Sequence, residues 1–115
     1  MHQFAYSEIL ESSGAEARRK ERDAFDRVIA LLLRAHASRP GSVDVAEAMF
    51  RLRQLWVVLT DDLSDPANAY PDNLKASLIS IGIWMMKEAD AISTGKHEKL
   101  ETVIAINTMI RDGLR

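Results

Sequence analysis

The sequence contains no cysteine and few of the residues that most often interrupt helices. Without a thiol, the 115-residue chain has no disulfide, zinc–thiolate site, iron–sulfur cluster or cysteine nucleophile. Its three prolines and five glycines are few, and almost all of them lie between segments with periodic apolar residues. The formal net charge is only −2, so the chain as a whole has no electrostatic attraction to nucleic acid or to an anionic membrane.

No hydrophobic run is long enough to span a bilayer. The longest nearly apolar stretch runs from Leu78 to Met86, whereas a membrane-spanning helix needs roughly 20 residues. The first residues lack both the cationic and the apolar region of a secretory signal. We therefore expect no membrane insertion and a location in the cytoplasm, whose reducing conditions suit a chain without cysteine.

Apolar residues recur at helical spacing in four segments, and no segment alternates with the period of two that strands need. We predict a single compact all-α domain, residues 1–115, of four mainly antiparallel helices over about 14–37, 44–63, 71–94 and 97–113. A non-helical N-terminal arm, 1–12, precedes them. Ser13 with Glu16 and Asp44 with Glu47 are possible capping pairs, Pro71 suits a first helical residue, and Gly95 a helix end.

The periodicity also predicts which residues form the core. On the last helix, Asn107 and Arg111 interrupt the apolar face, so either this end frays or Arg111 pairs with a carboxylate. The residues expected on the buried faces are Phe25, Val28, Ile29, Leu32, Leu33 and His36 on the first helix, Val45, Met49, Leu52, Trp56, Leu59 and Leu63 on the second, Leu74, Leu78, Ile81, Met85, Ala89 and Ile92 on the third, and Leu100, Val103, Ile104, Ile110 and Leu114 on the fourth.

Two of the helices carry more apolar residues than one buried face requires. On the third helix, Ile79, Ile83 and Met86 form a second stripe, roughly 140° around the helix from the first. On the second helix, Phe50 and Val57 extend the apolar surface. Two interpretations stay open: the N-terminal arm, with Phe4, Tyr6, Ile9 and Leu10, covers one of these faces, or the faces bind a partner.

Gly82 lies in the middle of the third helix, where glycine costs about 1 kcal/mol relative to alanine. A glycine at such a position usually permits another backbone to approach closely. That neighbour is either another helix of the domain or the helix of a partner. The candidate partner-binding residues are Phe50, Val57, Ile79, Gly82, Ile83 and Met86.

The sequence offers no pattern of residues typical of catalysis, of a metal or of a cofactor. The three histidines are far apart, and the aspartates around Asp61 lack the glycine that a calcium-binding loop requires. No phosphate-binding or dinucleotide-binding glycine motif is present. We therefore expect neither catalytic residues nor a cofactor, and not an enzyme.

One basic cluster, Arg18-Arg19-Lys20-Glu21-Arg22, is interleaved with acids. Glu16 with Lys20 and Asp23 with Arg27 have the spacing of helical ion pairs, which favours a solvated helix face. RNA binding is the alternative, although the cluster lacks the interleaved aromatic residues that stack on bases.

Four short tracts resemble the FlaF family of flagellar proteins. They are the start Gln3-Phe4-Ala5-Tyr6, the tract Arg53-Gln54-Leu55-Trp56, the tract Leu78-Ile79-Ser80-Ile81-Gly82-Ile83-Trp84, and the ending Ile106-Asn107-Thr108-Met109-Ile110-Arg111-Asp112-Gly113-Leu114. The tracts occur in the family's order and span nearly the whole chain. One minor departure is Tyr70, where the family pattern has leucine.

This resemblance implies a small cytoplasmic protein needed for flagellin production, and not an enzyme. It also implies a link to flagellin and to the flagellin-synthesis regulator FlbT. Flagellin has terminal helices that are disordered and apolar-faced before assembly, so a groove that binds them in the manner of a secretion chaperone would suit such a family. The alternative is a post-transcriptional regulator of flagellin messenger that acts with FlbT, for which direct contact with RNA is the less favoured route.

Overall fold

The computed structural model describes the backbone of residues 2–114 and the side chains of residues 15–114. Four helices follow one another: α1 (His2–His36), α2 (Val43–Ser64), α3 (Asp72–Ser93) and α4 (Leu100–Gly113). This confirms the predicted all-α fold. Over the described residues there is no strand, and no helix is both long and apolar enough to cross a membrane.

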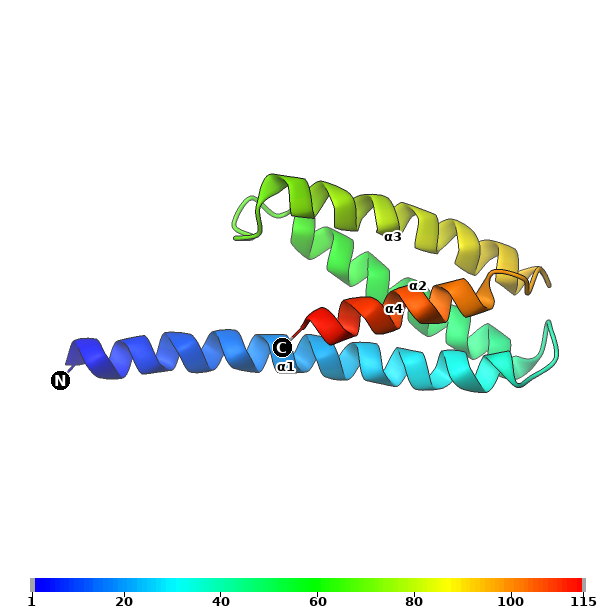
Figure 1. Cartoon of the computed structure of the whole chain (residues 1–115), viewed down its shortest axis with the longest axis horizontal. Helices are drawn as coiled ribbons and strands as arrows, with labels where there is room; N and C mark the ends of the chain where they lie inside the picture. The colour runs from blue at the N-terminus through cyan, green and yellow to red at the C-terminus, as the bar shows by residue number, and fades with distance from the viewer. Residues whose placement is uncertain (1, 115) are drawn as a thin grey trace.

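The largest difference from the sequence prediction lies at the N-terminus. Instead of a non-helical arm over 1–12, α1 begins at His2 and continues without a break to His36, past the proposed cap at Ser13. The physical reason is that no proline precedes Pro40, and Gly14 alone costs only about 1 kcal/mol in a helix. The first turns of α1 extend beyond the other helices (Figure 1), and the molecule measures 59 × 25 × 18 Å. The side chains of Phe4, Tyr6, Ile9 and Leu10 lie outside the described part.

The remaining helix ends differ by a few residues from the predicted ones. Ser42, rather than Asp44, caps α2: its hydroxyl accepts a hydrogen bond from the Val45 N–H (3.4 Å). Pro71 occupies the position before α3, and α4 begins at Leu100 instead of 97. Gly95 ends α3 as predicted, with φ +99°, and the Lys96 N–H donates to the Ala91 carbonyl (3.0 Å).

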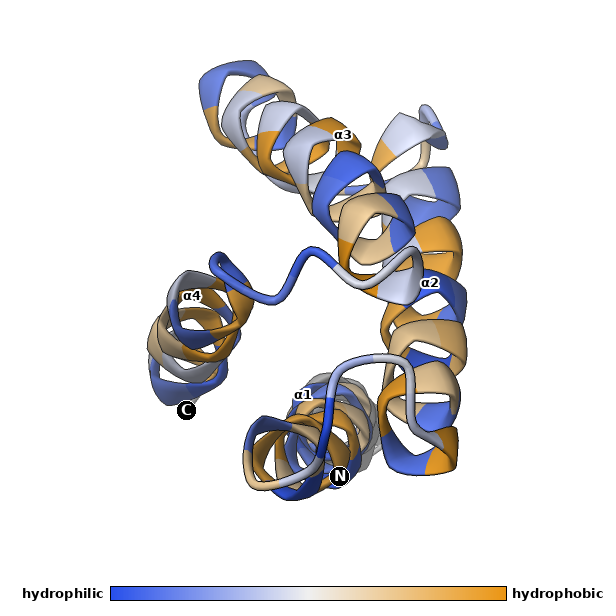
Figure 2. Cartoon of the chain, turned by 90° about the vertical axis from the view of Figure 1, so that its right-hand side faces the viewer, coloured by the Kyte–Doolittle hydropathy of each residue, from blue (hydrophilic) through white to orange (hydrophobic). Residues whose placement is uncertain are grey.

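Helix α2 occupies the centre of the fold. It packs extensively against α1 on one side and α3 on the other, whereas α4 packs on α1 and touches α3 only slightly. In the end-on view of Figure 2, α1 and α2 lie side by side, while α3 and α4 stand apart. The arrangement is therefore an open one, in the order α4, α1, α2, α3.

The side chain of Trp56 on α2 contacts the other three helices. Its ring meets Phe25 of α1 edge to face, with 6.1 Å between centroids. Its Nε1–H donates to the Oδ1 of Asn107 on α4 (3.0 Å), and Asn107 in turn donates to the Val103 carbonyl (2.7 Å). Asn107 is fully buried, so this polar group is satisfied inside the core rather than at a frayed end.

Most of the predicted core is confirmed, and the main exceptions lie on α1 and α3. Leu59 of α2 and Ile104, Ile110 and Leu114 of α4 pack against the core but are only partly buried. Leu33 is 55% exposed and His36 is exposed, because the buried face of α1 continues through Leu32 to Ala35, and Leu33 lies about 100° further around the helix. On α3, Met85, Ala89 and Ile92 are buried. The first half of the same stripe is not: Leu74 is 42% exposed, and Leu78 and Ile81 are only partly buried.

Arg111 supports the second interpretation of the α4 end, since its guanidinium pairs with Asp26 of α1 (3.1 Å) and with Asp112. The ion pair and the Trp56–Asn107 bond both draw α4 toward α1 and α2. The N-terminal half of α3 is consequently left without a helix against its apolar stripe.

Gly82 provides a test of the packing between α2 and α3. A Cβ at this position would lie 2.7 Å from Cγ2 of Thr60 and 3.3 Å from the Trp56 ring. Thr60 is held in place because its hydroxyl donates to the Trp56 carbonyl (2.7 Å). We expect Gly82→Ala to lower the free energy of unfolding by about 1 kcal/mol in urea titrations, because overpacking outweighs the gain of about 1 kcal/mol in helix propensity.

The matched variant is Thr60→Ser, which removes the obstructing methyl and keeps the hydroxyl. Combined with Gly82→Ala, it should recover at least half of the lost stability in a double-mutant cycle. If Gly82→Ala alone stabilises the protein, α2 does not approach α3 as closely as described.

Candidate functional site

The residues predicted to bind a partner lie along the outer side of the α2–α3 contact, with one exception. Phe50, Val57 and Ile83 are 58%, 45% and 57% exposed, and Ile79 and Met86 are partly buried. These five residues define the α2–α3 outer surface.

Gly82 is the exception. It is buried, and the space beside it is filled by Trp56 and Thr60 of α2. Of the two interpretations of this glycine, the structure supports the internal one: the close neighbour is a helix of the same domain. Gly82 therefore positions α3 on α2 and is not itself available to a partner.

The outer surface is contributed by two helices that pack against each other. Arg53 of α2 pairs with Asp90 of α3, and Thr60 lies against Gly82, which fixes the antiparallel register of the two helices. The same register places Val57 opposite Met86. Beside them, Phe50 and Val57 line a shallow hollow of about 300 Å³ together with Arg53, Gln54 and Val58.

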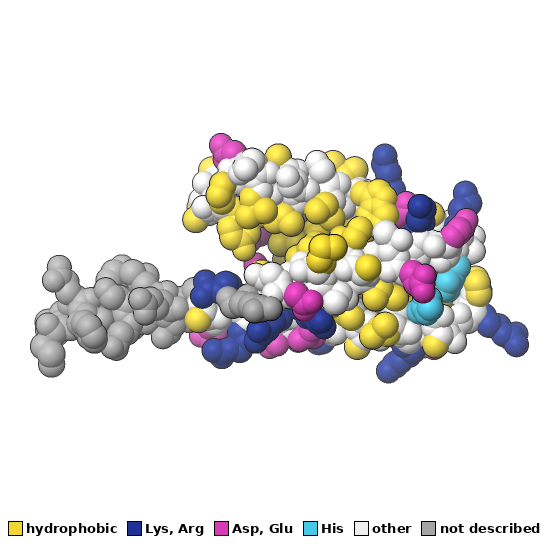
Figure 3. All heavy atoms as spheres, viewed as in Figure 1, with side chains coloured by type: hydrophobic (Ala, Val, Ile, Leu, Met, Phe, Trp, Pro, Cys, Tyr) yellow, Lys and Arg dark blue, Asp and Glu magenta, His cyan; other side chains and the backbone are white. Residues whose placement is uncertain are grey.

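A second apolar area, which the sequence analysis did not single out, lies on the opposite flank of α3. Leu74, Leu78 and Ile81 belong to its core-facing stripe but are incompletely covered. On α4, Ile106 and Ile110 are also partly buried. Figure 3 shows apolar side chains gathered along the side of α3 that borders a hollow above α1. We call these five residues the α3–α4 cleft. Helical periodicity alone could not predict that they are incompletely covered, because their burial depends on α4 packing toward α1.

The histidines form no catalytic arrangement among the described side chains. His36 Nε2 lies 3.8 Å from a Glu101 oxygen, and the rings of His36 and His97 are 6.5 Å apart between centroids. Nδ1 of His97 is buried without a hydrogen-bond partner in the structure. Within residues 15–114, no three histidine, aspartate or glutamate side chains are placed to hold a metal ion.

The basic cluster lies on a solvated helix face, as predicted, but the predicted ion pairs are absent among the described side chains. Arg18, Arg19, Lys20 and Arg22 all point into solvent. The predicted pairs of Glu16 with Lys20 and Asp23 with Arg27 do not occur among the described side chains, where the ion pairs join His36 to Glu101, Arg53 to Asp90, and Arg111 to Asp26 and Asp112. Exposed pairs at helical spacing contribute only about 0.3–0.5 kcal/mol, which does not hold long side chains in one geometry.

One carboxyl group in the α1–α2 contact is electrostatically perturbed. Burial, and then the negative charge of Asp62 on α2, raise the pKa of Glu21 on α1 above its usual range. Burial, and then the same two carboxylates, raise the pKa of Tyr70 in the loop before α3. Two acids from facing helices therefore lie close together in a partly dry environment.

This shift predicts a pH-dependent effect on stability. Because folding raises the pKa of Glu21, the folded state binds this proton more tightly than the unfolded state does. The fold therefore loses stability as the pH rises from the usual pKa of the unfolded chain through the raised pKa, and the cost disappears at acidic pH, where both states are protonated. We expect Glu21→Gln to raise the melting temperature near pH 7 and to leave it unchanged near pH 3. Glu98→Gln, at an exposed carboxyl between α3 and α4, is the control; an equal gain from Glu21→Gln at both pH values would contradict the assignment.

Comparison with known proteins agrees with the resemblance seen in the four sequence tracts. The chain matches the family model described as "Flagellar protein FlaF" over residues 2–114, which is nearly its whole length. No curated protein and no solved structure matches the chain. The chain therefore belongs to the FlaF family of flagellar proteins.

Proposed function

We propose that this protein binds flagellin, and that the α2–α3 outer surface receives an apolar-faced terminal helix of flagellin before assembly. The observation that carries the proposal is the exposure of Phe50, Val57 and Ile83 on two adjacent helices. Monomeric proteins rarely leave contiguous apolar patches unused. In a chain of a flagellar family, a helix of flagellin is the partner that best suits such a surface.

The expected affinity fits a protein that must release what it binds. A helix that buries about 500 Å² of apolar surface would gain roughly 12 kcal/mol before costs, at about 25 cal/mol per Å². Ordering a disordered segment and losing rotational and translational freedom each take several kcal/mol of this gain. Two costs of at least about 3 kcal/mol each leave roughly 6 kcal/mol or less, which corresponds to a Kd of tens of micromolar or weaker and would support synthesis and export of flagellin without trapping it.

The alternative function is control of flagellin messenger, directly or together with FlbT. Its support is the basic cluster of α1, where Arg18, Arg19, Lys20 and Arg22 are exposed and form no ion pair with a described carboxylate. The cluster lacks aromatic residues between its cations, so the protein partner is the better-supported proposal. Direct contact with RNA would appear as binding of flagellin messenger that weakens steeply with salt.

The flagellin proposal is tested by charged substitutions on the outer surface. We expect Ile83→Asp and Val57→Asp each to weaken binding of purified flagellin at least tenfold in titration calorimetry. The physical reason is that the contact would bury an unpaired carboxylate in apolar surroundings, which costs more than about 1.4 kcal/mol.

Two variants serve as controls, and circular dichroism verifies that all of them are folded. Leu33→Asp places the same charge at a residue of similar exposure on α1 and should bind normally. Leu74→Asp tests the α3–α4 cleft and should also bind normally. If Leu74→Asp abolishes binding while Ile83→Asp and Val57→Asp retain it, flagellin occupies the cleft and the surface assignment is wrong. If all four variants bind as well as the unmodified chain, neither surface receives flagellin.

A further inference from the structure

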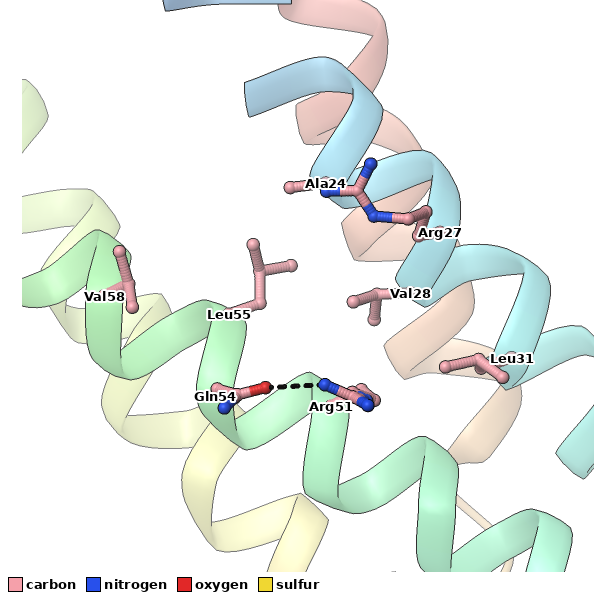
Figure 4. Close-up of a pocket in the computed structure, with 8 residues that line it drawn as sticks. All are labelled: Ala24, Arg27, Val28, Leu31, Arg51, Gln54, Leu55 and Val58. Carbon is pink, nitrogen blue, oxygen red and sulfur yellow. Dashed lines mark hydrogen bonds between the residues drawn. The ribbon is translucent and has the colours of Figure 1, made fainter. Parts of the chain in front are cut away.

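A groove that the flagellin proposal does not use runs along the contact between α1 and α2. It consists of two adjoining hollows of about 510 and 290 Å³, which share Ala24, Leu55 and Val58 in their walls. Val28 and Leu31 of α1 continue the apolar lining, as the close-up in Figure 4 shows. We call this feature the α1–α2 groove.

The two ends of the groove differ in charge. In the half of the groove that Leu31 lines, the charged lining residues are Arg27 of α1 and Arg51 of α2, and the Arg27 guanidinium lies toward Ala24 (Figure 4). Neither forms an ion pair with a described carboxylate; instead, Arg51 donates to Gln54 (3.2 Å) and lies 5.7 Å from the Phe50 ring centroid. This end is therefore positive, and its cations are available to a partner.

The other end carries two acids and one base. Glu21 and Asp62 line it from facing helices, and Lys20 is beside them. The pKa of Glu21 is raised by burial and by Asp62, so the charges of this pair are poorly compensated within the chain. A cation brought by a partner would relieve the repulsion between the two carboxylates.

The length and shape of the groove suit a short helix. From Glu21 to Leu31, α1 rises about 15 Å at about 1.5 Å per residue, which corresponds to roughly three helical turns. An α-helix also carries partial positive charge at its N-terminus and partial negative charge at its C-terminus. Both the dipole and its terminal side chains can therefore be matched to the charged ends of the groove.

We propose that the α1–α2 groove binds an amphipathic helix of a partner protein in a single orientation. The basic N-terminal end of that helix lies beside Glu21 and Asp62, its acidic C-terminal end lies beside Arg27 and Arg51, and its apolar face covers Leu55 and Val58. The bound helix runs parallel to α1 and antiparallel to α2. The inference does not depend on flagellin binding at the α2–α3 outer surface, since its decisive residues are different ones.

The test uses two designed peptides of about 18 residues, long enough to span the groove and stapled so that both are equally helical. They share one apolar face; one carries lysines in the first turn and glutamates in the last, and the other has these charges exchanged. In titrations at low salt, we expect the peptide with basic N-terminus to bind the full chain about tenfold more tightly than its counterpart. The preference should shrink in high salt, because exposed charges are screened.

Charge-changing variants assign the orientation to this groove. Arg27→Glu with Arg51→Glu should remove the preference, and adding Glu21→Lys and Asp62→Lys should reverse it. The matched control, Arg22→Glu with Arg39→Glu, makes the same charge change at exposed positions outside the groove and should preserve the preference. Thermal unfolding verifies that each variant folds. If a multiple variant does not fold, Arg27→Glu alone replaces it in the test and should reduce the preference at least twofold.

Several results would overturn the proposal. Equal affinity for the two peptides, no binding of either, or a preference unchanged by Arg27→Glu with Arg51→Glu would each do so. Loss of peptide binding in Ile83→Asp but not in the groove variants would place the helix on the α2–α3 outer surface. Sedimentation of the free chain provides the last arm: a dimer that Arg27→Glu with Arg51→Glu dissociates would make a second copy, rather than another protein, the occupant.

Discussion

Trp56 is the residue on which the arrangement of the four helices depends. It extends from the central helix α2, meets Phe25 of α1 edge to face, closes over Gly82 of α3, and donates its indole N–H to Asn107 of α4. The ring and the glycine set how closely α3 approaches, and the buried hydrogen bond fixes the position of α4. If α4 moved away, the buried indole N–H would lose its partner at a cost of about 1–3 kcal/mol. The position of α4 therefore depends on the position of the Trp56 ring, which also contacts α1 and α3.

The position of α4 explains why so much apolar surface stays open. Asn107 and the Arg111–Asp26 ion pair hold this short helix against α1 and α2, and it touches α3 only slightly. Apolar residues occupy much of the circumference of α3, and α2 covers only the middle of this apolar face. The residues on either side of the contact with α2 therefore remain accessible. A domain with a longer α4 lying across α3 would close the bundle. In this fold that flank stays open, and our proposal places the partner helix on the other flank, the α2–α3 outer surface.

The sequence predicted what local chemistry decides and missed what depends on neighbouring helices. The spacing of Val45, Met49, Leu52 and Trp56 identified the buried face of α2, and Gly95 marked a helix end, because periodicity and φ preference act within one segment. The prediction of a non-helical arm was wrong, because a possible capping residue at Ser13 does not by itself interrupt a helix when no proline is nearby. Exposure of Ile83 was predictable from its stripe. The α1–α2 groove was not, because its lining residues lie in two different helices and come to one groove only through the packing.

The central claim is that the α2–α3 outer surface receives flagellin. Nuclear magnetic resonance of the methyl-labelled chain, with unlabelled flagellin added, tests this claim most directly. At 12.9 kDa the chain is small enough for each methyl signal to be followed. The account predicts the largest shifts at Val57, Ile79, Ile83 and Met86, with Leu33 unaffected. Shifts confined to Leu74, Leu78, Ile106 and Ile110, or the absence of any shift at saturating flagellin, would contradict it.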